Sequence, residues 1–470
     1  MTPEDISFLQ PGSLWPPEES RERLKRYEDH YKLFRGRHDE VSGYAEAFRL
    51  LKRDDDNIIQ LIVNYPGALS TLFADLIANE PPRFNVADEN KEAQEWLDEF
   101  VNEHKLTQKI YTGALSQSYR GEAILKLHLR DKKAKISLVP ANIWFPVVDP
   151  SNVTEAIGHV FAWPITIDNK EYLRAEIHFP GMVHQRLYTL SGDRIGERVD
   201  TSILGLDVAE DQGTGVDGCL VAVVPNLELD NTLYGKDDYE DADTLFQQLD
   251  LRLAQIAKVL DKHTSPGMYG PDSGLFTDDD GASYARADAY ITVPPGEQPP
   301  AYLTWDAQLD ANWKYLEQIY DALFIVTGTN KAAFGLLDGT NALSGAALKK
   351  ILMRPLSKAA IKRGYWDSAL KYIIPLAAQL EKAHGGGADD FWLDIEWQDG
   401  LPNDPREDAE IENIRTGGRP TSSVKSAIRR LDGGSEESIQ QELDAINEDE
   451  GQATMTQTPF NFLGDIDDED

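Results

Sequence analysis

Two long amphipathic stretches separated by a proline-rich segment constrain the fold of this chain more than any other feature. Apolar residues recur at steps of three and four through residues 240–263 and again through residues 306–327, the spacing of one buried helix face. Residues 264–305 between them hold six prolines and five glycines, which do not continue a helix. The pattern predicts two helices, each about 35 Å long, that carry a small insertion with one strand at residues 289–293.

The apolar stripe of the second helix includes Leu316 and Leu323. If the two helices project as an arm, one subunit cannot bury apolar stripes on both sides of them. We therefore expect this stripe to contact a neighbouring copy, and we expect aspartate at both positions to give monomers or aggregates.

The rest of the chain predicts an α+β fold. Helices are expected over residues 20–35, from Asn64-Tyr65-Pro66 to a stop at Pro81-Pro82, and over residues 90–118. From Gly121 onwards, short alternating runs separated by turn residues predict strands. These are residues 123–129, 135–139, 160–163, 172–179, 183–190 and 220–224.

A helix is expected over residues 344–383, opened by Ser344 and kinked or interrupted by Pro355 and Pro375. A strand at residues 391–397 and helices at 404–416 and 421–431 follow. Residues 388–470 carry 23 acidic and 6 basic side chains. We expect residues 451–470 to form a solvated acidic tail.

The chain has 46 basic and 81 acidic residues, which give a formal net charge of −35. Such a surface disfavours tight general binding to nucleic acid or to an anionic membrane, because phosphates would meet like charge. Residues 344–383 differ, with eight basic and two acidic side chains. Two interpretations of this basic helix stay open: it neutralises acidic neighbours, or it faces DNA.

Motifs of catalysis and cofactor binding are missing or out of context. Residues 213–218 match the letters of a dinucleotide fingerprint but precede a strand instead of opening a helix, which favours a turn-rich loop. The chain has no phosphate-binding P-loop and no G-x-S-x-G elbow. Its nine histidines are scattered, and its one cysteine, Cys219, excludes an internal disulfide. We expect no enzyme activity, no metal and no cofactor.

Neither export nor membrane insertion is expected. Residues 1–5 are acidic where a signal peptide has a basic start, and the longest uncharged stretch, residues 57–74, contains too many polar groups for a membrane span. A soluble protein is expected.

Several segments, taken in order, carry a resemblance to a known family. They are residues 27–38 (YEDHYKLFRGRH), 64–81 (NYPGALSTLFADLIANEP), 223–227 (VVPNL), 234–238 (YGKDD) with the following helix to 263–266 (HTSP), and 343–349 (LSGAALK) after a Gly-bounded segment. In this order, over roughly residues 20–430, the chain resembles the portal proteins of tailed bacteriophages of the siphovirus type.

The resemblance implies a portal-type subunit with a defined order of parts. Residues 1–239 would form the α/β wing, 240–263 and 306–328 the two stem helices, and 264–305 the clip. Residues 329–343 would be a tunnel loop, 344–400 the second part of the wing, 401–450 a helical crown and 451–470 the acidic tail.

The resemblance also implies the function and the partners. About twelve subunits would assemble in the host cytoplasm and form a ring at one capsid vertex of the virion. Double-stranded DNA would pass through the channel of this ring, with weak contacts and without sequence specificity. The clip would dock the packaging ATPase, the large terminase subunit, and later the head–tail connector. Major capsid and scaffolding proteins would be further partners, and no membrane is implied.

Three groups of residues are the candidate sites. DNA-facing residues of the tunnel loop would be Asn330, Lys331, Asp338, Thr340 and Asn341, and Gly335 and Gly339 would let the loop move. The basic helix would contribute Lys349, Lys350, Arg354 and Lys358. The motor-docking clip would use Asp278, Asp279, Asp280 and Arg286.

Other interpretations stay open. The loop at 329–343 could be static and merely turn the chain. The protein could be a different structural component of the virion, such as a connector or minor capsid protein, or a soluble hydrolase without a recognisable motif.

Overall fold

The computed structural model divides the chain into two compact units, Met1–Gly400 and Leu401–Asp470. Within the chain, the structure describes residues 2–52, 61–87, 90–205, 209–264, 268–269, 276–277, 283–284, 296, 301–302, 309–336, 345–398, 405–417, 420–431 and 438–447.

Two of the first three helices of the larger unit, α1 (Glu18–Phe34) and α3 (Tyr65–Ala78), lie where the sequence predicts helices. The side chain of Asn64 caps α3, because its Oδ1 accepts a hydrogen bond from Gly67 N at 3.0 Å. Helix α2, Ser42–Lys52, was not predicted.

The expected single helix over residues 90–118 is wrong. The structure contains two helices, α4 (Lys91–Glu103) and α5 (Leu106–Arg120). Lys105 between them adopts a left-handed conformation with φ of 48°, which ends the hydrogen-bond ladder of α4. Leu106 and Ile110 then point into the main core.

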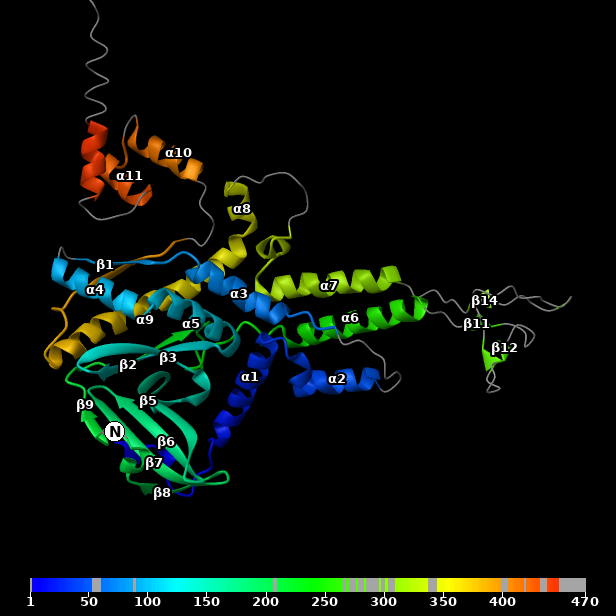
Figure 1. The fold of residues 1–470 in the computed structure, drawn as a ribbon, viewed down its shortest axis with the longest axis horizontal. Helices are drawn as coiled ribbons and strands as arrows, with labels where there is room; N and C mark the ends of the chain where they lie inside the picture. The colour runs from blue at the N-terminus through cyan, green and yellow to red at the C-terminus, as the bar shows by residue number, and fades with distance from the viewer. Residues whose placement is uncertain are drawn as a thin grey trace, which may run out of the picture. The chain divides into compact units, whose positions relative to one another are not determined.

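A six-stranded antiparallel sheet forms one end of the larger unit (Figure 1). Its order is β4 (Trp144–Asp149), β5 (Asn152–Ile167), β6 (Lys170–Phe179), β7 (Met182–Ser191) and β8 (Arg194–Val199), with β9 (Asp211–Gly213) beside β7. The predicted strands at 172–179 and 183–190 are confirmed, whereas the strand predicted at 160–163 is only the centre of a much longer one. Strand β4 was missed because it contains Pro146, β8 because its pattern is charged, and β9 because it has only three residues.

A second sheet has the order β10 (Val221–Pro225), β2 (Glu122–Arg130) and β3 (Lys133–Val139), and all three strands were predicted. Gly121, just before β2, has φ of 93°, and a Cβ there would lie 2.2 Å from the carbonyl oxygen of Gly235. Glycine is therefore required where these two backbones meet. Strand β1 (Arg83–Val86) pairs with β15 (Leu393–Glu396), of which only β15 was predicted.

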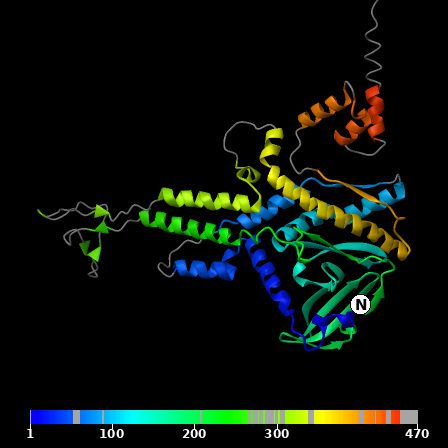
Figure 2. The same ribbon diagram turned by 180° about the vertical axis from the view of Figure 1, so that it is seen from behind.

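Helices α6 (Asp243–Thr264) and α7 (Leu309–Thr327) lie side by side and extend from the rest of the unit (Figures 1 and 2). They confirm the two helices predicted at 240–263 and 306–327. The strand predicted at 289–293 lies outside the described residues. Between the two helices the structure describes only the short pairs β11 (Met268–Tyr269) with β14 (Ala301–Tyr302), and β12 (Phe276–Thr277) with β13 (Ser283–Tyr284).

The basic helix predicted at 344–383 consists of α8 (Gly345–Ile351) and α9 (Met353–Ala383). The expected interruption occurs near Pro355, and Pro375 lies inside α9. Helix α9 crosses the unit and buries Trp366, Leu370 and Ile373 in the main core. Helix α9 therefore connects the sheets with the base of α6 and α7.

The smaller unit contains the predicted helices α10 (Pro405–Thr416) and α11 (Val424–Leu431). Arg430 pairs with Glu412 at 2.7 Å and joins the two helices. The division at residue 400 coincides with the predicted start of the crown, and the naming of the parts stays a prediction.

Candidate functional site: the base of the two long helices

The apolar stripes of α6 and α7 face each other inside one subunit. Leu316 and Leu323 are buried, as are Leu249 and Ile256 of α6. The expectation that Leu316 and Leu323 contact a neighbouring copy is therefore wrong. Helix α6 covers this stripe, so aspartate at these positions would disrupt the fold of the subunit and would not test assembly.

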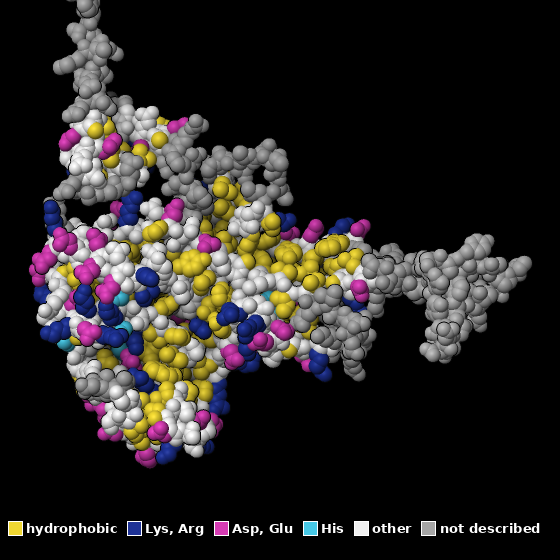
Figure 3. All heavy atoms as spheres, in the orientation of Figure 1, with side chains coloured by type: hydrophobic (Ala, Val, Ile, Leu, Met, Phe, Trp, Pro, Cys, Tyr) yellow, Lys and Arg dark blue, Asp and Glu magenta, His cyan; other side chains and the backbone are white. Residues whose placement is uncertain are grey.

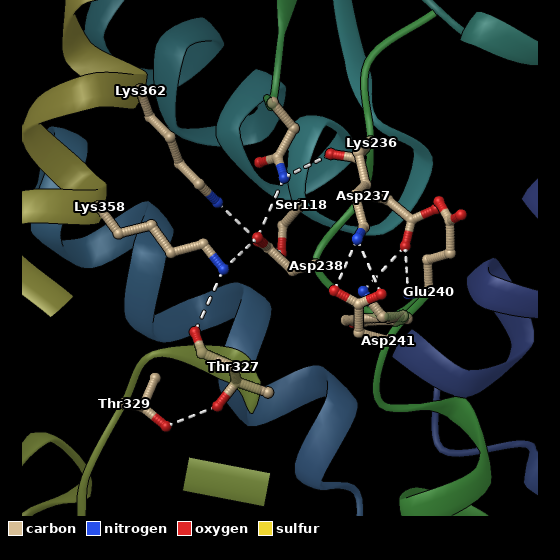
Figure 4. A network of polar contacts seen from close by, with 12 residues as sticks. Ser118, Lys236, Asp237, Asp238, Glu240, Asp241, Thr327, Thr329, Lys358 and Lys362 are labelled. Atoms are coloured by element: carbon tan, nitrogen blue, oxygen red, sulfur yellow. Dashed lines mark hydrogen bonds and ion pairs between the residues drawn. The ribbon is translucent and has the colours of Figure 1, made fainter. Parts of the chain in front are cut away.

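A fully buried carboxylate, Asp238, lies just before α6 (Figure 4). Its oxygens accept hydrogen bonds from Ser118 Oγ at 2.6 Å and Asn226 Nδ2 at 3.0 Å. They also pair with Lys358 Nζ at 2.9 Å and Lys362 Nζ at 2.6 Å. Burial alone would raise the pKa of Asp238, but the two lysines and Asn226 hold it well below its usual value. Asp238 is thus a fully satisfied buried anion.

The two lysines stand one turn apart on α9 and connect it with the end of α7 and with the segment that precedes α6. Lys358 Nζ also donates to the carbonyl oxygen of Thr327 at 3.2 Å, at the end of α7 (Figure 4). Lys362 lies over the ring of Phe73, 4.1 Å from its centroid, and burial lowers the pKa of Lys362 to about 8. We call Asp238, Thr327, Lys358 and Lys362 the junction.

A second ionic cluster attaches α6 to α1. His30 lies between Asp237, at 3.3 Å, and Asp243, at 3.0 Å. Farther along α6, the buried Asp250 pairs with His38 at 2.5 Å and accepts a hydrogen bond from the main chain of Val63 at 3.0 Å. These contacts, together with the junction, fix the base of the long helices on several sides.

Raising the pH from 7 to 9.5 is expected to destabilise the subunit through His30. Burial alone would lower the pKa of His30, but its close contacts with the carboxylates of Asp237 and Asp243 raise it to about 10. The stabilisation is complete below the unfolded-state pKa, about 6.5, and is lost as the pH rises through about 10. The His30 contribution lost by pH 9.5 is on the order of 3 kcal/mol. Lys362 offsets part of this loss, because its lowered pKa of about 8 lets it lose its buried charge over the same interval.

The change in thermal unfolding midpoint between pH 7 and pH 9.5 checks this prediction. The variant His30→Gln is expected to lose less than the wild type over this interval. His104→Gln is the matched control, because burial lowers the pKa of His104 and leaves it neutral above pH 7. Equal losses in the wild type and both variants would contradict the assignment to His30.

The described half of the predicted tunnel loop is anchored. Residues Lys331–Phe334 form the turn η7. Asn330 Oδ1 accepts from Ala333 N at 2.9 Å, and Asn330 Nδ2 donates to the carbonyl oxygen of Ile351 at 2.7 Å. Lys331 is exposed. Asp338, Thr340 and Asn341 lie outside the described residues, as do the clip residues Asp278, Asp279, Asp280 and Arg286.

Aromatic packing and hydroxyl contacts fix the same turn. The ring of Phe334 lies 5.3 Å from Tyr65 and 6.1 Å from Phe324, centroid to centroid. The hydroxyl of Thr329 lies 3.2 Å from that of Tyr65 and 2.8 Å from that of Thr327. Residues 329–335 are therefore held at the end of α7.

The predicted basic helix divides into two kinds of lysine. Lys358 takes part in the junction, as does Lys362, which the sequence did not single out; both neutralise a buried acid. Lys349, Lys350 and Arg354 are exposed at the break between α8 and α9. The first of the two open interpretations is therefore correct for the turn that faces Asp238.

An exposed strip of charge runs along α7. Asp310, Lys314, Glu317 and Asp321 recur at steps of four, three and four, and all four are exposed. None of them forms an ion pair with another described residue. The spacing of these residues on one helix face can be found from the sequence, but it was not predicted above.

The comparisons with known proteins decide the family. A model of the family described as phage portal protein, SPP1 Gp6-like, matches residues 17–454. The chain belongs to this phage portal protein family. No curated protein matches the sequence.

Solved structures similar to this portal protein include chains of gene transfer agent (GTA) particles. A chain from the neck of an empty GTA particle, with C6 symmetry, has 11% identity, a TM-score of 0.48, and covers 83% of this chain and 99% of its own. A chain from the neck of a native particle, with C12 symmetry, has 10% identity, a TM-score of 0.45, and coverages of 78% and 89%. A chain from the virion of a native particle has 9% identity, a TM-score of 0.44, and coverages of 82% and 93%.

The portal family is a structural one. In the described part of this portal protein, no group of three or more histidine, cysteine or acidic side chains is placed to hold a metal ion. None of the helices there is both long and apolar enough to cross a membrane. The polar clusters described above join α9 to the end of α7 and α1 to the start of α6.

Proposed function

We propose that this portal protein assembles in the host cytoplasm into a ring of about twelve copies. In the virion, this ring occupies one vertex of the capsid. Double-stranded DNA is packaged and ejected through the channel of the ring. The observation that carries this proposal is the pair of long helices α6 and α7. Helix α7 has an exposed acidic strip, and buried ion pairs hold the base of the pair.

The acidic strip supports a channel wall along which DNA slides. Asp310, Glu317 and Asp321 against the single Lys314 give each copy of α7 a net negative face. Negative groups repel phosphates, so the wall lacks the deep, salt-dependent binding sites that rings of lysine or arginine create. DNA that must move in both directions needs such a weakly interacting surface. We therefore place this strip toward the channel.

Exposed apolar side chains near the junction support contacts between copies. Ile325, Leu336 and Met353 are 65%, 64% and 66% exposed. Figure 3 shows hydrophobic side chains gathered over α7 and α8. Large apolar groups gathered in this way mark interaction surfaces on soluble proteins. A second copy of the subunit is the partner that a ring places against this surface.

The remaining parts receive the roles implied by the family. Residues 264–305 dock the packaging ATPase and later the head–tail connector, and capsid and scaffolding proteins contact the outer parts. Lys331, Lys350 and Arg354 make transient phosphate contacts at the entrance of the channel. Lys358 is left out of the proposed DNA contacts because it pairs with Asp238.

The mass of the purified protein in solution tests the assembly. Light scattering at micromolar concentration is expected to give about 630 kDa, which is twelve copies of the 52.6 kDa chain. The double variant Ile325→Asp and Met353→Asp is expected to give smaller species. Val153→Asp, at a residue 58% exposed in the large sheet, is the matched control and should leave the mass unchanged. A compact wild-type monomer would refute the proposal.

A further inference from the structure

The hydrogen-bond ladder has a gap where α8 meets α9. Leu352 N donates to Leu348 O at 2.9 Å, and Leu356 N donates to Leu352 O at 3.0 Å, so the ladder continues on both sides of the break. In a regular helix the amide of residue 355 would donate to the carbonyl oxygen of Ile351. Residue 355 is proline and has no N–H. The carbonyl of Ile351 is therefore left without its main-chain donor.

The side chain of Asn330 fills this gap. Its Nδ2 donates to Ile351 O at 2.7 Å, while its Oδ1 accepts from Ala333 N at 2.9 Å. One amide group thus caps η7 with its oxygen and completes the helix ladder with its nitrogen. Aspartate could keep the cap but has no donor for the carbonyl.

The two sides of this hydrogen bond are held very differently. On one side, η7 is fixed by Tyr65 through Thr329 and Phe334, as described above. On the other side, Leu352 is buried at the break, whereas its neighbours Ile351 and Met353 are 41% and 66% exposed. The hydrogen bond from Asn330 therefore ties the exposed carbonyl end of α8 to the fixed turn η7.

We propose that Asn330 is a positioning residue that replaces the missing amide of Pro355 and sets the resting position of α8 about the break at Leu352. The positioning role of Asn330 follows from the hydrogen bonds alone. The place of α8 beside the channel rests on the proposed function. Breaking the hydrogen bond releases α8, with its exposed Lys350, while η7 stays at the end of α7.

A double-mutant cycle with Pro355 tests the replacement directly. Hydrogen exchange of the amide of Leu352, at the end of α8, is measured in the full-length protein. Asn330→Ala is expected to speed this exchange about fivefold, because a net hydrogen bond contributes about 1 kcal/mol. Pro355→Ala supplies the missing N–H, so in that background Asn330→Ala is expected to change the exchange less than about threefold.

Asn330→Asp separates the two roles of the side chain. It keeps the oxygen that caps η7 and loses the donor, so exchange of Leu352 should rise as in Asn330→Ala, while the amide of Ala333 stays protected. Equal effects of Asn330→Ala with proline and with alanine at position 355 would overturn the proposal. So would unchanged exchange of Leu352 in Asn330→Asp.

Light scattering on the same samples keeps the two proposals apart. A wild-type sample that does not assemble counts against the proposed ring and leaves the exchange cycle interpretable. An assembled sample in which the cycle shows no coupling counts against Asn330 alone.

Discussion

Replacing Asp238 with alanine is expected to lower the free energy of unfolding by about 3–5 kcal/mol. The change leaves Lys362, which is fully buried, and Lys358 without their counter-charge. It also removes the acceptor for Ser118 Oγ. A buried charge without a partner is far more costly than the loss of an exposed ion pair. Chemical denaturation followed by circular dichroism measures the loss.

The control lies three residues along the chain. Asp241 pairs with Lys236 at 2.6 Å, and its side chain is 58% exposed. Asp241→Ala is expected to cost less than about 1 kcal/mol. The neutral pair Asp238→Asn with Lys362→Met should recover much of the stability lost in Asp238→Ala, because no unpaired charge remains on Lys362. Similar losses for Asp238→Ala and Asp241→Ala would contradict the role of the junction.

Reversing the acidic strip of α7 is expected to turn a sliding surface into a binding one. Glu317→Lys with Asp321→Lys changes the charge by +4 per subunit, or by about 48 in a ring of twelve. Each added lysine releases counterions when it meets a phosphate, so affinity becomes high and steeply dependent on salt. Packaging is expected to fall by more than tenfold at low salt and to recover in part as salt is raised.

Binding of duplex DNA to the purified ring gives a readout that is independent of the motor. The double variant is expected to bind DNA at low salt, whereas the wild type does not. Glu171→Lys with Glu197→Lys makes the same charge change at exposed positions of the large sheet and is the matched control. If the control binds and packages like the strip variant, the effect is one of net charge, and α7 does not line the channel.

The periodicity of apolar residues was sufficient to predict the long helices and strands. It was insufficient to predict how the chain breaks between them. The stripes of α6 and α7 and the alternation of β6 and β7 are strong local patterns, and both were predicted correctly. The break at Lys105 depends on a left-handed residue that carries no local signal. The break near Pro355 was expected, but its repair by Asn330 depends on a contact across 21 residues.

The sequence predicted the site residues from their type, but tertiary contacts determine what each of them binds. Lys358 looks like a DNA contact in the sequence because it lies on a basic helix. In the structure it pairs with Asp238, 120 residues earlier in the chain. Nothing in the pattern of either segment identifies this pairing. The acidic strip of α7, in contrast, could be predicted from the spacing of Asp310, Glu317 and Asp321 alone.

Electron cryomicroscopy of the purified protein tests the central claim most directly. The account predicts a closed ring of about twelve copies around a channel, with Glu317 and Asp321 of every copy lining its wall. A monomer, an open assembly, or a ring in which α7 faces outward would contradict it.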